Sequence, residues 1–222
     1  MKDTVTRRNF LATAGVAALA TSLARGAEEA PKGKALKILG IACSPRKGMT
    51  TAKAVQAALD SAKGVDPRIE IELIDLGGLS IAGYSPKPPQ DDFTAILPKL
   101  QDPALGGLII GSPSYFRGMS SLCKAFIERC APLREPKMLL ADKPVGVVAV
   151  GAFRNGGQEL VIEQIQTAML CFGMIPVGGK PPAFQGATAH ATKDDIAGDE
   201  AGLDTARKLG IHVAELAAKL AA

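Results

Sequence analysis

The sequence is poor in the side chains that build metal and nucleic-acid sites. It contains no tryptophan and two histidines among 222 residues, and only 4% of its residues are aromatic. His190 and His212 have no other metal-ligating residues around them at a ligand spacing. The sequence therefore predicts no metal site.

The four cysteines are scattered, and no two of them form a CxxC pair. Cys123 and Cys130 lie seven positions apart on one helical pattern, about 10 Å along the helix axis. This is farther than the Cα separation that a disulfide tolerates. We therefore expect free, buried thiols at all four positions, while a bridge that involves Cys43 or Cys171 stays open in an oxidising compartment.

Residues 1–26 have the pattern of a twin-arginine signal peptide. Arg7 and Arg8 precede a weakly apolar stretch over 12–23, and small residues follow it. The stretch is too short to span a membrane comfortably. The sequence predicts a signal peptide over 1–26 and a linker over 27–35, with export through the Tat translocase to the periplasm. The alternative is an ordinary basic N-terminus.

Most of the positive charge belongs to this predicted signal. The whole chain has a formal charge of +4, and residues 1–26 hold four basic residues and one acidic residue, so the remainder is close to +1. No basic patch remains that would favour nucleic acid. Residues 36–222 have the length of one domain and contain no second run long enough to cross a bilayer, so we expect no stable membrane insertion after export.

Apolar runs of strand length alternate with helical patterns along residues 36–222. This alternation predicts an α/β fold, in which a parallel sheet is covered by helices on both faces. Two segments rich in proline, glycine and polar residues, 76–91 and 179–198, are predicted to be loops over the site or at a subunit contact. The expected strands are LKILGIA, RIEIELIDL, LGGLIIGSP, PVGVVAVG and MIPVGG, and the expected helices follow residue 50 and cover about 120–131, 157–172 and 199–220.

The turn after the first strand has the composition of an anion site. In such sheets, ligands bind at the carboxyl ends of the strands. Ser44, Arg46, Thr50 and Thr51 supply hydroxyl groups and a guanidinium next to a helix N-terminus, which attracts anions. The spacing matches neither a Walker motif nor GxGxxG, so a phosphate monoester is favoured. The alternative is a capped helix with a solvated arginine.

Two further loops at the same edge are unusual. Two adjacent aromatic residues stand in the segment 113–118, where a flat ligand would account for them, and paired glycines in 153–157 would let backbone N–H groups approach a ligand. The alternatives are packing of the aromatic pair against a neighbouring loop or subunit, and a tight strand-to-helix connection. Three such loops at one edge favour a ligand site.

The segments SPRKGMTT, GSPSYFRGMSSLCKAFIER and GAFRNGGQE resemble the NADPH-dependent FMN reductase and iron–sulfur flavoprotein branch of the flavodoxin-like flavoproteins, over about residues 36–178. The resemblance implies a flavodoxin-like three-layer sandwich with a five-stranded parallel sheet in the order 2-1-3-4-5, and FMN at the strand ends. By position it implies Ser44, Arg46, Thr50 and Thr51 for the phosphate, Pro113, Ser114, Tyr115, Phe116, Arg117 and Gly118 along the isoalloxazine, and Phe153, Arg154, Asn155, Gly156 and Gly157 at its other edge.

The sequence departs from this family pattern at two places, and these bear on the cluster and on the phosphate contacts that the resemblance implies. Family members with an iron–sulfur cluster have a compact cysteine motif after the second strand, but residues 76–91 contain no cysteine. We therefore expect no iron–sulfur cluster, because its iron needs thiolate ligands. Met49 and Thr50 stand where the family often has Gly and Asn, which leaves the individual phosphate contacts open.

The expected function is that of an FMN-dependent oxidoreductase that reduces a quinone, another small organic acceptor, a metal ion or a redox protein. The alternatives are a flavodoxin-like one-electron carrier and a binding domain that has lost its flavin. The resemblance implies NAD(P)H as donor, although export would separate the protein from the cytoplasmic pool. It also suggests a homodimer or higher homo-oligomer, and no side chain is predicted to be catalytic, because the flavin carries the chemistry.

Overall fold

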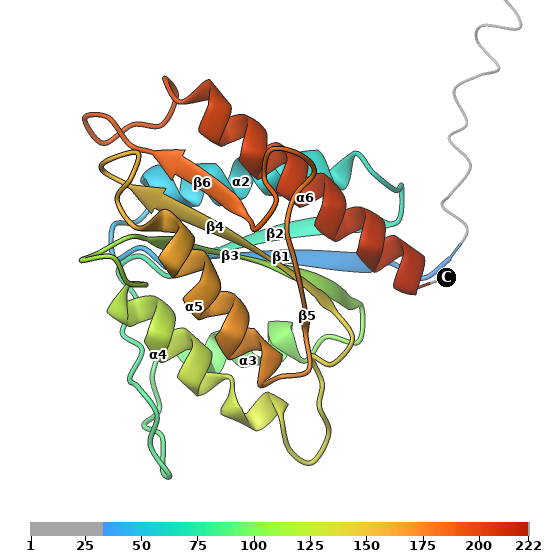
Figure 1. Ribbon diagram of the computed structural model, residues 1–222. Helices are drawn as coiled ribbons and strands as arrows, with labels where there is room; N and C mark the ends of the chain where they lie inside the picture. The colour runs from blue at the N-terminus through green and yellow to red at the C-terminus, as the bar shows by residue number, and fades with distance from the viewer. Residues whose placement is uncertain (1–32, 222) are drawn as a thin grey trace, which may run out of the picture. The chain divides into compact units, whose positions relative to one another are not determined.

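The central sheet contains strands in the order β2-β1-β3-β4-β5, all parallel (Figure 1). This confirms the predicted α/β class and the flavodoxin-like strand order. The computed structural model describes residues 33–221, so the expected signal peptide lies outside the described residues, as does most of the linker. The strands are β1 (Leu36–Ala42), β2 (Ile69–Asp75), β3 (Leu105–Pro113), β4 (Pro144–Gly151) and β5 (Ile175–Val177).

Helices cover both faces of the sheet, as the continuous apolar character of the central strands requires. Figure 1 shows α2 (Thr50–Lys63) and α6 (Glu200–Leu220) on one face, with the other three on the opposite face. Two separate groups of buried residues fill the space between helices and sheet. The opposite face carries α3 (Phe93–Leu100), α4 (Ser121–Arg129) and α5 (Gln158–Leu170), with a short 3-10 helix, η2 (Ala131–Leu133), after α4.

The segment 179–198 is not a simple loop, and this prediction was wrong in part. It contains a further strand, β6 (Ala187–His190), which pairs in parallel with the second half of β4. The first half of β4 pairs with β5. The two short strands therefore follow one another along the same edge of β4. In contrast, the segment 76–91 contains no helix or strand, as expected.

Helix α2 lies unusually close to the sheet and to α6, because glycines stand at the contact points. A Cβ atom added at Gly111 would lie 2.3 Å from Cγ2 of Val55, and one added at Gly40 would lie 2.6 Å from Cγ1 of the same residue. A Cβ atom at Gly210, in α6, would lie 1.9 Å from the carbonyl oxygen of Ala58 in α2. The N-terminus of α2 is thereby held against the carboxyl ends of β1 and β3.

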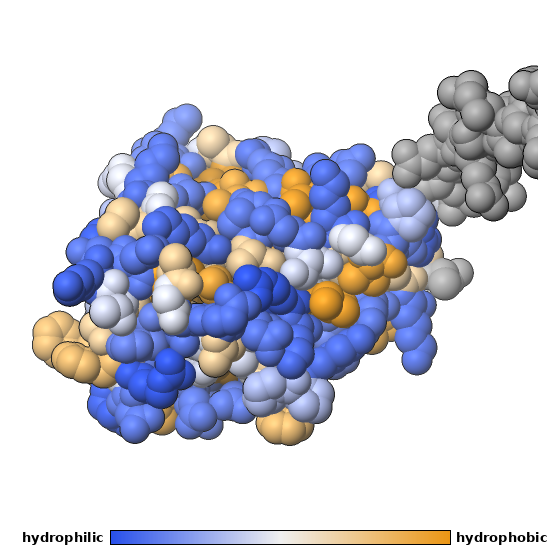
Figure 2. All heavy atoms as spheres, turned by 90° about the horizontal axis from the view of Figure 1, so that it is seen from above, coloured by the Kyte–Doolittle hydropathy of each residue, from blue (hydrophilic) through white to orange (hydrophobic). Residues whose placement is uncertain are grey.

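The face shown in Figure 2 is largely hydrophilic, and apolar residues appear on it as small groups between charged and polar ones. Within residues 33–221, no helix combines the length and the apolar character that a membrane crossing needs.

Replacing Gly210 by alanine tests the close contact between α2 and α6. In a helix without such a contact, Gly→Ala stabilises by about 0.5–1 kcal/mol. Here we expect the opposite sign, with a loss of about 1–3 kcal/mol in the free energy of unfolding, because the new methyl group overlaps the α2 backbone. Urea denaturation measures the difference.

Gly64→Ala is the control for this change. Gly64 caps α2 with a φ of −77°, and an added Cβ would lie 3.8 Å from its nearest neighbour. We expect its stability to be unchanged or slightly raised. A stabilised Gly210→Ala variant would contradict the packing described.

Candidate functional site

A cavity of about 550 Å³ opens at the carboxyl ends of β1, β3, β4 and β6. It combines residues from the three loops proposed for the ligand with residues from the end of β4 and from the segment 179–198, which was predicted as a loop over the site or at a subunit contact without named site residues. The predicted residues in its wall are Arg46, Thr50, Pro113, Ser114, Tyr115 and Phe153. The additional ones are Val150, Gly151, Ala152, His190, Ala191, Thr192, Lys193 and Asp194.

The N-terminus of α2 beside this cavity is not capped by a protein side chain. Its N-cap residue, Met49, offers no hydrogen-bonding side chain, and the first turn contains no acidic residue. Thr51 is only 1% exposed, and its hydroxyl oxygen has no hydrogen-bond partner among the described residues. A buried polar group without a partner is costly. The N-terminus of α2 therefore offers hydrogen-bond donors to an anion, and among the described residues no acceptor binds the Thr51 hydroxyl.

The turn before α2 is fixed by Asp75, at the end of β2. The Asp75 carboxylate accepts hydrogen bonds from the backbone N–H of Gly48 at 2.6 Å and of Gly77 at 2.9 Å. Gly77 also lies so close to Lys47 that an added Cβ would come within 2.4 Å of its backbone. Ser44 Oγ accepts from Arg46 N at 3.2 Å, so its own proton can be donated to a ligand.

Ser120 joins this turn to the aromatic loop. Its hydroxyl donates to the Cys43 carbonyl at 2.6 Å and accepts from Cys123 N at 3.0 Å, which caps α4. Its backbone N–H donates to Ser112 Oγ at 3.0 Å. One buried side chain thus ties the end of β1 to β3 and to the start of α4. Serine is a preferred N-cap residue, so the segment Ser-Ser-Leu at the start of α4 could have indicated this role of Ser120.

The loops 113–118 and 153–157 contact each other directly. Tyr115 and Gly118 exchange two backbone hydrogen bonds of 3.0 Å around Phe116 and Arg117, and both central residues have positive φ angles. Gly157 has a φ of +90°, and an added Cβ there would lie 2.8 Å from Cβ of Arg117. Ser114 adds a hydrogen bond of 2.7 Å from its hydroxyl to the Gly156 carbonyl.

The remaining predicted residues are absent from the cavity wall. Phe116 is fully exposed, and Phe153, which does belong to the wall, is also largely exposed. Arg154 Nη2 donates to Asp199 Oδ1 at 2.8 Å. Burial of Asp199 would raise its pKa, but the hydrogen bonds from Arg154 and from the backbone outweigh burial and lower it. Arg117, Gly118, Asn155, Gly156 and Gly157 complete the two loops.

The segment 179–198 contains a tight turn over residues 192–195, which we call the 192–195 turn. Thr192 and Asp195 exchange backbone hydrogen bonds of 2.8 and 3.0 Å, and Lys193 and Asp194 between them both have positive φ angles. Arg46 donates to the Asp194 carboxylate, and Lys53 of α2 donates to Asp195 at 3.0 Å. His190, just before the turn, lies with its Nε2 atom 3.1 Å from the Ala152 carbonyl.

The cysteines differ in part from the expectation. Cys43, Cys123 and Cys130 are buried free thiols, as predicted, but Cys171 is exposed at the end of α5. Burial raises the pKa of the Cys43 and Cys130 thiols. They are therefore protonated at neutral pH and are poor nucleophiles.

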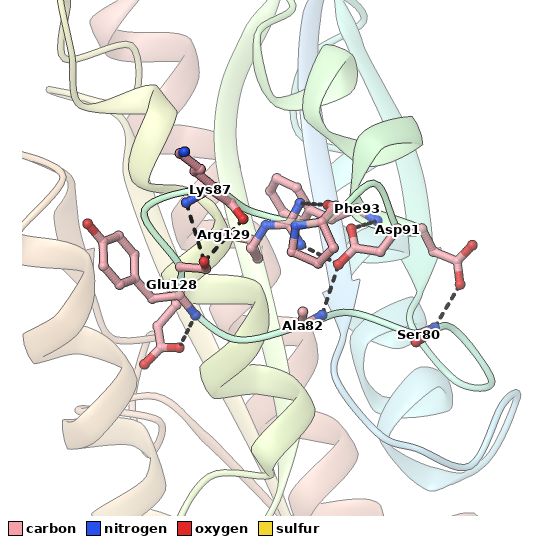
Figure 3. Close-up of polar contacts among 11 residues, drawn as sticks. Ser80, Ala82, Lys87, Asp91, Phe93, Glu128 and Arg129 are labelled. Carbon is pink, nitrogen blue, oxygen red and sulfur yellow. Dashed lines mark hydrogen bonds and ion pairs between the residues drawn. The ribbon is translucent and has the colours of Figure 1, made fainter.

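The segment 76–92 is held in place by carboxylates of α4 and of its own end (Figure 3). Asp91 accepts from Ala82 N at 2.9 Å, from Phe93 N at 3.1 Å, and from the guanidinium of Arg129. The guanidinium also lies over the Phe93 ring, 5.1 Å from its centre. Glu128 accepts from Tyr84 N at 2.7 Å. Residues 33–221 contain no group of three or more His, Cys, Asp and Glu side chains that could hold a metal ion.

The Asp91–Arg129 ion pair is well shielded from solvent. The two side chains are 9% and 8% exposed. Burial would raise the pKa of Asp91, but the hydrogen bonds from Ala82, Arg129 and Phe93 outweigh it and hold the pKa below its ordinary value. Folding therefore favours the charged carboxylate at this position.

Relatives support the class that this geometry indicates. An iron–sulfur flavoprotein of Methanocaldococcus jannaschii is 38% identical over 192 residues, which cover 82% of this chain and 97% of the relative. An NAD(P)H dehydrogenase (quinone) of Paracoccus denitrificans is 32% identical, covering 78% of this chain and 89% of the relative. A WrbA-like flavodoxin of Agrobacterium tumefaciens shares the fold with a TM-score of 0.58 and 19% identity, covering 84% of this chain and 99% of that one.

Fold and site together define a flavodoxin-like α/β protein with an uncapped helix N-terminus beside a cavity at the strand ends. The sequence profile of the family described as NADPH-dependent FMN reductase matches residues 36–189. The chain belongs to this family and is an FMN-dependent oxidoreductase.

The pH dependence of stability tests the Asp91–Arg129 pair. Because the pKa of Asp91 is lowered in the folded protein, its contribution is complete above the ordinary aspartate pKa of about 3.9 and is lost as the pH falls through the lower folded-state value. At pH 7 we expect Asp91→Asn to reduce the free energy of unfolding by about 3 kcal/mol, since Arg129 then loses its counter-ion. The difference should shrink in acid.

Asp92→Asn is the matched control, because the exposed Asp92 carboxylate accepts a hydrogen bond from Ser80 N at 2.7 Å and belongs to no ion pair of the segment 76–92. We expect a loss several times smaller. Equal losses of stability for the two variants at neutral pH would show that the buried ion pair stabilises the protein no more than the exposed hydrogen bond of Asp92.

Proposed function

We propose that the protein binds FMN in the cavity and uses it to reduce a quinone, another small organic acceptor or a redox partner protein. The observation that carries this proposal is the Thr51 hydroxyl, which is buried without a partner at an uncapped helix N-terminus. A phosphate oxygen accepts from such hydroxyl groups and from helix N–H groups. The residues present therefore fit the phosphate of FMN.

In this proposal the phosphate is held by Ser44, Arg46, Thr50 and Thr51. Ser44 and Thr51 are buried, and Arg46 and Thr50 stand in the cavity wall. The ring system lies along the loops 113–118 and 153–157, where Tyr115 and Phe153 offer flat apolar surfaces. Bound FMN supplies hydride and single-electron chemistry at its ring.

The protein contributes position and charge to this chemistry. The loop 153–157 borders the cavity through Phe153, and we assign to this loop the stabilisation of the negative charge that accumulates on a reduced flavin. Arg154 is already paired with Asp199, so Arg117, which packs on Gly157, is the better candidate for the supporting cation. The protonated thiols of Cys43 and Cys130 take no part.

The choice of acceptor is supported by the relative named NAD(P)H dehydrogenase (quinone), at 32% identity. We further propose a homodimer whose second subunit covers the exposed Tyr115 and Phe116, because exposed aromatic pairs beside a cavity are otherwise a liability. Light scattering of the flavin-loaded protein decides this point, since a monomer at micromolar concentration contradicts it.

Thr51→Val tests the phosphate assignment. The change removes a hydroxyl without a protein partner, so we expect the protein without flavin to be as stable as the wild type or slightly more stable. FMN affinity should fall about tenfold to a hundredfold, because a hydrogen bond to a charged group contributes about 1.5–3 kcal/mol. Titration of the flavin-free protein with FMN, followed by flavin fluorescence, measures the affinity.

Thr205→Val provides a control with the opposite expectation. Thr205 is also buried in a helix, but its hydroxyl donates to the Gly202 carbonyl at 2.7 Å. We expect about 1 kcal/mol of lost stability and unchanged FMN affinity. If Thr51→Val leaves FMN affinity unchanged, the phosphate lies elsewhere.

We also propose that the protein is exported in folded form by the twin-arginine pathway, with FMN inserted beforehand, and receives electrons from an exported or membrane donor. Arg7 and Arg8 support this proposal. Changing both to lysine should leave FMN-loaded precursor in the cytoplasm. Cell fractionation with an antibody measures this, and normal export of the double-lysine precursor would contradict the pathway.

A further inference from the structure

The 192–195 turn places a carboxylate at the cation that is proposed to hold the FMN phosphate. Arg46 and Asp194 form an ion pair in the wall of the cavity, and Thr50 and Lys193 lie in the same wall. Asp194 follows Arg46 by 148 positions in the sequence, so this pairing is a product of the fold alone. A carboxylate therefore stands where an anionic ligand would meet the guanidinium.

The 192–195 turn has an uncommon backbone conformation. Lys193 and Asp194 have φ angles of +49° and +62°, and neither is glycine. Left-handed residues of this kind are infrequent and concentrate at functional sites. The second carboxylate of the turn, Asp195, pairs with Lys53 on the outer side of α2, away from the cavity wall.

We propose that Asp194 weakens the preference of the site for FMN over riboflavin, because its carboxylate competes with the FMN phosphate for Arg46. The inference rests on the proposed FMN function. A phosphate monoester carries close to two negative charges at neutral pH, and it can displace one carboxylate from a guanidinium. Riboflavin has no phosphate that could replace the Asp194 carboxylate, so the Arg46–Asp194 ion pair stays formed when riboflavin binds.

The exposure of the pair makes this exchange feasible. The side chains of Arg46 and Asp194 are 45% and 63% exposed, and exposed ion pairs contribute little to stability. The turn can therefore release Arg46 at small cost, while the Asp195–Lys53 pair of 3.0 Å continues to hold it near α2. Lys193, next in the turn, keeps a positive charge at the cavity wall after the exchange.

Asp194→Asn tests the competition. Asparagine tolerates a left-handed backbone, so the turn is expected to persist. The change frees Arg46 and removes a negative charge from the phosphate end. FMN should bind about two- to fivefold more tightly at low salt, the fold-change that corresponds to one exposed ion pair. Riboflavin affinity should not change, and the gain for FMN should diminish in high salt. Flavin fluorescence titrations measure both ligands.

Two controls separate competition from a general effect of charge or of turn opening. Asp195→Asn removes the same charge from the same turn and also weakens the Lys53 contact that holds the turn near α2, but it leaves the Arg46–Asp194 pair intact. FMN affinity should therefore rise clearly less than with Asp194→Asn. In an Arg46→Gln background the gain from Asp194→Asn should vanish, since the two changes act on one interaction.

Each other outcome overturns the proposal. Weaker FMN binding by Asp194→Asn would show that the carboxylate positions Arg46 for the phosphate. Equal gains for FMN and riboflavin, or equal gains from Asp195→Asn, would show that the turn restricts access without regard to phosphate. Unchanged FMN affinity would remove the competition and leave the FMN function standing, whereas wild-type protein that binds no FMN would remove both.

Discussion

The close packing of α2 on glycines of the sheet and of α6 is the constraint on which the site depends. Without side chains at Gly40, Gly111 and Gly210, the helix approaches until Val55 and Ala58 touch the positions where Cβ atoms would stand. This places the N-terminus of α2 at the ends of β1 and β3. The packing of the core thereby fixes the direction of the backbone N–H groups at this helix end. An anion that binds there would not lose free energy to the ordering of a flexible loop.

The arginines around this backbone frame are already paired with carboxylates. Arg46 pairs with Asp194, and Arg154 pairs with Asp199. A cation that already has a carboxylate partner gains only the difference between two interactions when an anionic ligand binds. In the proposed site, the Arg46–Asp194 pair would therefore lower the affinity for FMN and leave that for uncharged riboflavin unaffected, which reduces the preference for FMN.

Sequence patterns predicted the parts of this arrangement that have local signals. Buried strands appear as continuous apolar runs, and hydroxyl, aromatic and glycine residues directly after them marked three of the four segments in the cavity wall. The strand β6 was not predicted, because Ala187–His190 has no continuous apolar run and the surrounding segment is rich in glycine and proline. The Arg46–Asp194 pair joins residues 148 positions apart, and no local pattern encodes such a contact.

The segment 76–92 shows how the same fold can be completed by different chemistry. In this chain the segment contains no cysteine. Asp91 and Glu128 accept hydrogen bonds from two of its backbone N–H groups, and Arg129 is packed on Phe93. Carboxylates bound to backbone donors hold this loop, at the cost of burying one charge pair. The geometry of the loop therefore forms with the polypeptide itself.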